Sequence, residues 1–225
     1  MVILERDAFL RQLDALLQEA AAGQGRLVFV GGEAGVGKTT LIQHFCSASG
    51  GRAEIRAGAC DPLSTPRPLG PLVDVSPLMG GNLEHLLDTG ASREQLFRAL
   101  LALLASGSRP TVLVFEDVHW ADEATLDLLR FLGRRLAGIR VLLIATFRDD
   151  EVGPRHPLRV VLGDLTTSGA TRRLVLPPLS EQAVRLLAEG SQVDLGVLYR
   201  RTGGNPFFVT EVLAGGSKGI SVAGA

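Results

Sequence analysis

The feature that most constrains this chain is a glycine-rich segment at residues 32–39, which reads GEAGVGKT. It matches the whole phosphate-binding loop (P-loop) pattern G-x-x-x-x-G-K-[ST], in which backbone N–H groups surround phosphates and the lysine reaches the outer ones. Its lysine, Lys38, is one of only two in the chain; the other is Lys218. A compact ammonium suits this place and the planar arginine fork does not. The motif therefore predicts a phosphate site.

The residues on either side of the loop support this interpretation. Residues 27–30 form a short apolar run typical of a buried strand, and residues 39–45 begin a helix whose free N–H groups favour an anion. A glycine-rich structural turn is the alternative, but it would not need strand, lysine, threonine and helix together. We expect Mg²⁺ on the hydroxyl of Thr39. The expected nucleotide contacts in the loop are Gly32, Glu33, Ala34, Gly35, Val36, Gly37, Lys38, Thr39 and Thr40.

A second motif begins in the apolar run 112–115 and ends in two acids, Glu116 and Asp117. Mg²⁺ prefers hard oxygen ligands, so Glu116 is expected to serve the metal. Asp117 is expected to orient or deprotonate the attacking water. A slip of one residue would exchange these roles, and acids that merely end a strand are the alternative reading.

Arg148 follows a third apolar run, 141–147. An arginine there can contact a γ-phosphate and so sense whether it is present. The alternative is a surface pairing with Asp149, Asp150 or Glu151. We therefore count Lys38, Glu116, Asp117 and Arg148 as the candidate catalytic residues.

Predicted strands alternate with predicted helices along most of the chain. Further strands are expected at 54–60 and 173–176, with helices at 6–22, 92–106 and 122–137 and two short helices at 180–189 and 195–201. Ser92 and Asp122 are expected to cap their helices. Five prolines prevent regular structure throughout 61–77. Alternation of this kind predicts a parallel sheet with its ligand at the carboxyl ends of the strands, where both acids and Arg148 would meet the loop.

Composition excludes several classes of protein. The net charge of −1 over 225 residues predicts no basic face for nucleic acid, so we expect no direct nucleic-acid binding. No signal-peptide pattern and no run of 18 apolar residues is present, so we expect a cytoplasmic chain that does not bind membranes. Cys46 and Cys60 lack metal or redox spacing and are expected to be buried thiols.

Two further segments have both a structural and a functional interpretation. Gly204-Asn205-Pro206 can simply begin a helix, or Pro206 can form a wall for adenine and ribose. His119 and Trp120 are expected to pack near the second motif rather than to act as catalysts. The small-residue tail at 214–225 reads as a flexible linker cut short, which suggests a fragment of a longer protein.

Four segments in order, GEAGVGKTT, VLVFEDVHWADEATLDLL, LLIATFRDDE and TGGNPFFVTEVL, resemble the nucleotide-binding domain of STAND-class signalling ATPases. In particular they resemble the AAA-16 type ATPase domain of large actinobacterial LuxR-family transcriptional regulators. The resemblance covers about residues 4–213. Two departures are Glu116, where the family usually has Asp, and Glu5, where Gly usually precedes Arg6.

The resemblance implies an α/β P-loop NTPase of the ASCE type. The expected architecture is a three-layer sandwich with a parallel sheet of order 5-1-4-3-2 and a small C-terminal helical subdomain. Its expected units are residues 1–178, 179–213 and the tail 214–225. It also implies ATP or ADP with Mg²⁺ as cofactors, an adenine contact from Arg6, slow hydrolysis as a signalling switch, and further domains or protein partners outside this chain.

Three functions remain open at this point: a Mg-ATP-driven switch, a nucleotide-binding scaffold that does not hydrolyse, and a small-molecule kinase. Asp117 favours the first, because it supplies a carboxylate for the water. A kinase would use Arg155 and Arg159 on the transferred phosphate and residues 61–77 as a substrate loop. A GTPase is not expected, since neither Asn82 nor Asn205 lies in a guanine-reading signature.

Overall fold

The computed structural model describes residues 3–166 and 169–216 and is built on one parallel five-stranded sheet. The strands lie in the order β2-β3-β4-β1-β5, and every neighbouring pair is parallel. Read from the other edge this is 5-1-4-3-2, so the predicted topology is confirmed. The strands are β1 (Arg26–Gly31), β2 (Glu54–Ala59), β3 (Thr111–Glu116), β4 (Val141–Thr146) and β5 (Thr171–Val175).

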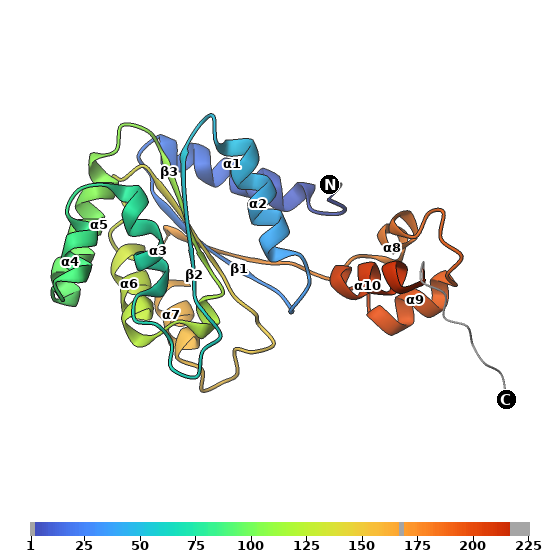
Figure 1. Cartoon of the computed structure of the whole chain (residues 1–225). Coiled ribbons are helices and arrows are strands. Elements are labelled where there is room, and N and C mark those ends of the chain that lie inside the picture. The colour runs from blue at the N-terminus through green and yellow to red at the C-terminus, as the bar shows by residue number, and fades with distance from the viewer. Residues whose placement is uncertain (1–2, 167–168, 217–225) are drawn as a thin grey trace.

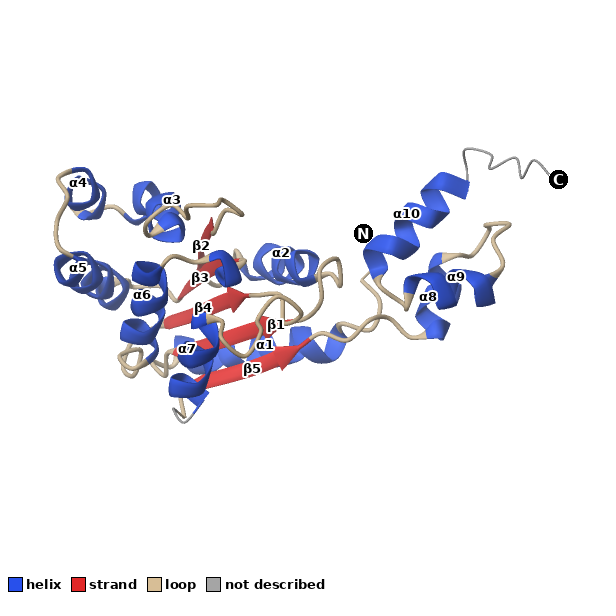
Figure 2. Cartoon of the chain, turned by 90° about the horizontal axis from the view of Figure 1, so that it is seen from below, coloured by secondary structure: helices blue, strands red, loops and turns tan. Residues whose placement is uncertain are grey.

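Alternate residues of the strands enter two separate hydrophobic layers, which is why the sheet can be covered on both faces. Val28 and Val30 of β1 belong to one layer, and Leu27 and Phe29 to the other. Helices α1 (Asp7–Ala21) and α2 (Lys38–Ser49) bury their apolar faces in the first layer. The remaining helices between β2 and β5 supply the second, which completes the three-layer sandwich (Figures 1 and 2).

The second layer is made by α3 (Gly70–Met79), α4 (Leu83–Asp88), α5 (Arg93–Ser106), the 3₁₀ turn η1 (Val118–Trp120), α6 (Glu123–Gly133) and α7 (Pro157–Thr166). Two caps are as the sequence predicts. Ser92 and Gln95 form a reciprocal capping box at α5, and Asp122 accepts the N–H groups of Ala124 and Thr125 at α6. These caps fix where the two helices begin.

The helices that the sequence did not predict are α3, α4 and α7. Proline is tolerated in the first turn of a helix, so Pro71, the second residue of α3, does not prevent it. The α3 backbone then packs directly on β2: a Cβ at Gly58 would lie 2.3 Å from the carbonyl oxygen of Pro71. Helix α6 ends at Gly133, four residues before the predicted end at Ala137.

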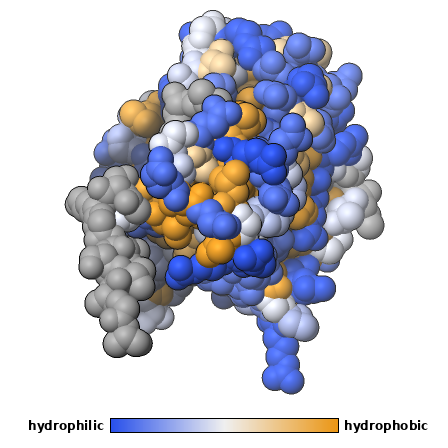
Figure 3. Space-filling view, turned by 90° about the vertical axis from the view of Figure 1, so that its right-hand side faces the viewer, coloured by the Kyte–Doolittle hydropathy of each residue, from blue (hydrophilic) through white to orange (hydrophobic). Residues whose placement is uncertain are grey.

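Three helices follow the sheet and form their own hydrophobic cluster: α8 (Glu181–Leu187), α9 (Leu195–Thr202) and α10 (Pro206–Gly216). Figure 1 shows them beside the sheet body, reached through the chain that leaves β5. Their side of the molecule carries a hydrophobic patch (Figure 3), and their exposed large apolar side chains are Leu186, Val197, Phe207 and Phe208. Helix α10 extends through Gly216, and the rest of the predicted tail, 217–225, lies outside the described residues.

Among the residues that the structure describes, no helix is both long and apolar enough to cross a bilayer.

Candidate functional site

The candidate site lies at the carboxyl edge of the sheet. The P-loop follows β1, Glu116 is the last residue of β3, and Arg148 comes two residues after the end of β4. A cavity of about 290 Å³, which we call the phosphate cavity because the P-loop lines it, opens between these segments. It is lined by Gly35, Gly37, Lys38, Thr39, Thr40, Asp117, Arg148, Pro206 and Phe207. The structure therefore brings together all three predicted segments and the start of α10.

Five consecutive carbonyl groups of the P-loop, from Gly32 to Val36, each accept a hydrogen bond. Lys38 Nζ donates to the first two, at 2.6 and 2.9 Å. Asn205 Nδ2 donates to Ala34 O at 2.8 Å, and the Phe207 N–H donates to Gly35 O at 3.3 Å. Arg6 donates to Val36 O at 3.1 Å. Because protein donors occupy these carbonyls, their negative ends are turned away from a phosphate bound in the loop.

Lys38 is the cation nearest to the loop backbone. Its side chain is largely buried, and this burial lowers the pKa of the ammonium, while the nearby Asp117 carboxylate opposes the shift. Desolvation strengthens the attraction of such a charge for an anion. Lys38 is thus placed to exchange its loop carbonyls for phosphate oxygens.

The hydroxyl and the carboxylate that are expected to hold Mg²⁺ also lie together. Thr39 Oγ1 donates to Glu116 Oε2 at 2.7 Å. This hydrogen bond joins the second residue of α2 to the last residue of β3. A hydroxyl and one carboxylate beside a phosphate cavity are hard oxygen ligands of the number that Mg²⁺ takes from protein. These residues fit the ion, and they fit it with Glu116 in the place where the family usually has Asp.

Asp117 has a left-handed backbone, with φ of 54°. Its N–H donates to Thr146 Oγ1 at 3.0 Å, so the end of β4 holds this conformation. Asp tolerates the left-handed region better than most residues, and such strain is common at functional sites. The turn places Asp117, and not Glu116, on the lining of the cavity.

Arg148 lines the cavity and is also paired. Its Nη1 lies 2.6 Å from Glu151 Oε1, and its guanidinium carbon lies 4.6 Å from the centre of the Trp120 ring. Burial raises the pKa of Glu151, but the hydrogen bond from Arg148 and the neighbouring charges outweigh it and the net shift is downward. Both predicted interpretations of Arg148 therefore have a basis, since it faces the cavity and holds a surface carboxylate.

His119 packs beneath this pair, as the sequence predicts, and not in the cavity. Its side chain is 1% exposed and its ring nitrogens lie 3.8 Å from Asp117 Oδ1 and 3.5 Å from Glu151 Oε2. Neither nitrogen has a hydrogen-bond partner among the described residues. Burial lowers the pKa of His119, against the two carboxylates that would raise it. A neutral imidazole follows.

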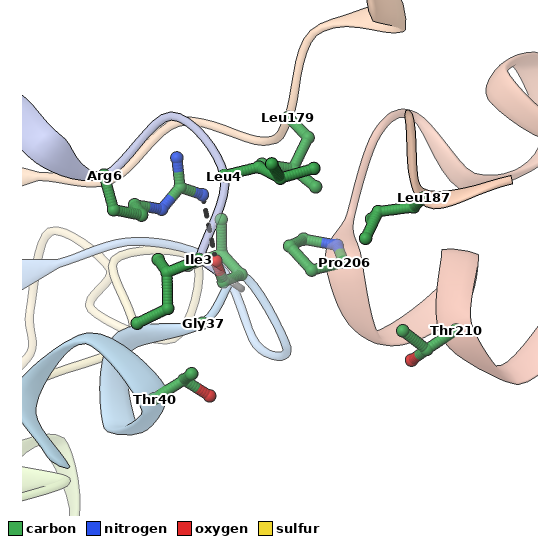
Figure 4. Close-up of a pocket in the computed structure, with 10 residues that line it drawn as sticks. Ile3, Leu4, Arg6, Gly37, Thr40, Leu179, Leu187, Pro206 and Thr210 are labelled. Atoms are coloured by element: carbon green, nitrogen blue, oxygen red, sulfur yellow. Dashed lines mark hydrogen bonds between the residues drawn. The ribbon is translucent and has the colours of Figure 1, made fainter. Parts of the chain in front are cut away.

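An apolar cavity of about 200 Å³ continues from the phosphate cavity, with which it shares Gly37, Thr40 and Pro206. Figure 4 shows Ile3, Leu4 and Arg6 on one side and Leu187, Pro206 and Thr210 on the other, with Leu179 beside Leu4. An apolar pocket next to a phosphate loop suits a flat base. Pro206 lines both cavities, so a single ligand that extends from one cavity into the other would pass beside it.

Arg6, the predicted adenine contact, lines the apolar cavity with its guanidinium turned to the backbone. Nη2 donates to Val36 O and, at 2.8 Å, to Pro177 O (Figure 4 draws the first of these bonds). The side chain is buried, and this burial lowers its pKa. Its donors hold two segments of chain together, so any contact with a base would be made by the flat side of the group.

The residues that sequence reasoning missed are Asn205 and Phe207, which bind the P-loop from the start of α10. The signal available in the sequence was a polar residue, Asn205, between Gly204 and Pro206. Of the two arginines proposed for a kinase lid, Arg155 and Arg159, Arg159 lines a different cavity of about 320 Å³ together with Phe147, Asp149 and Arg173. It does not line the phosphate cavity.

Comparisons with known proteins agree with this fold. The sequence model of the family described as AAA ATPase domain (AAA_16) matches residues 2–144. An uncharacterized protein of Rhizobium meliloti (strain 1021) is 28% identical over 257 residues, which cover 93% of this chain and 24% of that protein. The chain thus spans about a quarter of that relative.

Two solved structures are similar in fold. The Aeropyrum pernix ORC1 protein, in complex with DNA, has a TM-score of 0.60 at 17% identity over 96% of this chain and 60% of its own. Cdc6p from Pyrobaculum aerophilum has a TM-score of 0.54 at 16% identity over 84% of this chain and 49% of its own. At such identities the likeness shows the shared fold.

Proposed function

The chain belongs to the AAA ATPase domain family, and from this premise we propose that it binds Mg-ATP and ADP at the P-loop and hydrolyses ATP slowly, as a nucleotide-dependent switch. The observation that carries the proposal is the 2.7 Å contact between Thr39 Oγ1 and Glu116 Oε2. It joins two oxygen groups that suit such a metal, from residues 77 positions apart in the sequence, next to the cavity that the P-loop lines.

Each residue has a role in this proposal. The P-loop N–H groups and Lys38 bind the phosphates, and the apolar cavity beside Pro206 takes the base. Thr39 and Glu116 would hold Mg²⁺, which neutralises charge on the outer phosphates when bound. Asp117 orients a water molecule at the phosphate cavity, and Arg148 contacts the γ-phosphate after leaving Glu151. Hydrolysis here depends on positioning and electrostatics more than on covalent chemistry.

The slow rate is what the family resemblance implies, and the competition for Arg148 supports it. A side chain already paired with Glu151 at 2.6 Å and stacked on Trp120 must give up both interactions to reach a phosphate. The cost of this exchange is part of the barrier in every turnover. The same observation favours the second candidate, a domain that binds nucleotide and does not hydrolyse it.

The wider role is proposed on the sequence resemblance alone: the ATPase domain of a large LuxR-family transcriptional regulator, cytoplasmic, with its partner domains outside this chain. The fact that the chain spans 24% of its Rhizobium relative suits a domain within a much longer protein. We likewise propose the units 1–178, 179–213 and 214–225.

Mass spectrometry of nucleotide released from the purified protein tests the binding. We expect ADP in a resting preparation, and release of inorganic phosphate when Mg-ATP is added. Bound nucleotide without phosphate release would favour the second candidate. A protein that takes up neither ATP nor ADP would contradict both.

A further inference from the structure

Three consecutive residues near the N-terminus each contact a different segment around the apolar cavity. Leu4 packs against the hydrophobic cluster of α8–α10. Glu5 bonds to Ser180 at the start of α8. Arg6 donates to the P-loop at Val36 O and to the connecting chain at Pro177 O. We call residues 4–6 the strap, because they join the P-loop to the helices on the opposite wall.

Glu5 makes the contact that fixes the strap to α8. Its Oε2 accepts the Ser180 N–H at 2.8 Å, and its Oε1 accepts the Ser180 hydroxyl. The same hydroxyl accepts the Ala183 N–H at 3.2 Å, so one side chain caps α8 and holds Glu5. These hydrogen bonds from Ser180 lower the pKa of Glu5. The carboxylate is therefore in its accepting form near neutral pH.

The backbone of Glu5 has a conformation that costs free energy, and the contact with Ser180 occurs in spite of this cost. Its φ is 56°, in the left-handed region that residues with a Cβ enter at a cost. Strained residues of this kind persist where the surrounding interactions determine them, and they cluster at ligand clamps and switches. Here the determining interactions are those of its neighbours Leu4 and Arg6 and of Ser180.

The strap also forms one wall of the apolar cavity. Ile3, Leu4 and Arg6 face Leu187 and Pro206 across it (Figure 4). If the start of α8 moves away from Glu5, these two walls separate and the apolar end of the cleft opens. A base held between them could then leave.

We propose that Glu5 is a positioning residue that latches α8 to the strap and thereby slows the release of bound nucleotide. The identity of the ligand rests on the proposed function. The neighbours of Glu5, Leu4 and Arg6, line the apolar cavity, whereas neither Glu5 nor Ser180 lines the phosphate cavity. The latch should therefore act on ADP and ATP alike and leave the chemistry unchanged.

The test is the rate at which a fluorescent ADP derivative leaves the full chain after a chase with unlabelled ADP. Glu5→Gln keeps the size of the side chain and removes its charge, and Glu5→Gly removes the carboxylate while relaxing the backbone. Both should release the probe about three- to tenfold faster, as expected when charge-assisted hydrogen bonds at a solvent-exposed position are lost.

Substitutions at Ser180 separate the latch from the helix cap. Ser180→Asp keeps a good N-cap and repels Glu5, so release should be fast although α8 stays capped. Ser180→Thr keeps the hydroxyl and should restore slow release. Glu181→Gln, which neutralises the neighbouring exposed carboxylate that pairs with Arg185, is the matched control and should behave as the wild type.

Fast release in Glu5→Gln, Glu5→Gly and Ser180→Asp, with slow release in Ser180→Thr and Glu181→Gln, supports the latch. Wild-type release rates in both Glu5 variants, while the wild type binds the probe, would overturn the latch and leave the proposed function standing. A wild-type protein that binds no probe would overturn the two together. Faster release in Glu181→Gln as well would mean that general surface charge, and not Glu5, sets the rate.

Discussion

Thr39 Oγ1 and Glu116 Oε2 lie 2.7 Å apart, although 77 residues separate them in the sequence. The P-loop supplies the first and the end of β3 the second, and we propose that the metal and the outer phosphates meet at this contact. Asp117 follows directly, with a left-handed backbone that turns it into the phosphate cavity. The two acids thus lie in different places, and the different roles that we propose for them can be tested.

Asp117→Asn should reduce ATP hydrolysis by roughly 10²–10⁴-fold with little effect on binding, because a positioned carboxylate acts on the water and not on the nucleotide. Glu116→Gln should instead weaken the Mg²⁺ dependence of ATP binding. Phosphate release and calorimetry with and without Mg²⁺ measure the two effects. If Asp117→Asn keeps full turnover while Glu116→Gln loses it, the two roles are reversed.

Arg148→Ala should lower ATP affinity on the order of tenfold or more and leave ADP affinity unchanged, because the proposed contact exists only with the γ-phosphate. Glu151→Gln frees Arg148 from its partner and should raise the affinity for ATP. Arg155→Ala, a nearby exposed arginine, is the control. Equal losses of ATP and ADP would mean that Arg148 supports the fold or the β-phosphate, and no loss would leave it as a surface partner of Glu151.

Asn205→Asp should weaken ATP and ADP binding together, by roughly five- to a hundredfold. It replaces the donor to Ala34 O with an acceptor and leaves a P-loop carbonyl unpaired, which costs about 1–3 kcal/mol. Asn82→Asp makes the same chemical change at the exposed start of α4 and should bind normally. Titration calorimetry with both nucleotides checks this. Normal binding by Asn205→Asp would show that α10 does not shape the loop.

The two thiols predict a loss of stability at alkaline pH. Burial raises the pKa of Cys46 to about 11 and that of Cys60 to about 12, above the unfolded value of about 8.5. A raised folded pKa gives stability that is complete below the unfolded pKa and declines as pH rises towards the folded one. By pH 10 the loss should be about 1–2 kcal/mol for Cys60.

Urea denaturation at pH 7.5 and pH 10 measures this loss, with Cys60→Ala as the comparison. The variant starts less stable, because it leaves a small cavity, and should lose less stability between the two pH values. Parallel losses in the variant and the wild type would assign the effect to other groups.

Much of the framework could be predicted from the sequence because its signals are local. The P-loop, the acids after β3 and the caps at Ser92 and Asp122 each occupy a few adjacent residues with a definite chemical requirement. The strand order came from the family resemblance, and the sheet confirms it. Pro71 misled the prediction of α3, because a proline in the first turn reads as a break in a segment already rich in proline.

The contacts that Glu5, Arg6 and Asn205 make with distant segments could not be predicted. Nothing in the sequence near Glu5 indicates that Ser180 lies opposite it. Nor does it indicate that Arg6 donates hydrogen bonds to Val36 O and Pro177 O. The bond from Asn205 to Ala34 O spans 171 residues and depends on how α10 packs. These contacts decide the shape of the P-loop, and only the folded chain shows them.

The most direct test of the account is isothermal titration of Mg-ATP into the wild type and into Lys38→Ala. The wild type should bind one equivalent, and the variant should bind too weakly to measure, because the desolvated charge facing the phosphates is gone. Since Lys38 is buried and bonds to two loop carbonyls, circular dichroism of the variant must show an intact fold. Near-normal affinity in a folded Lys38→Ala protein would contradict the assignment of this loop as the nucleotide site.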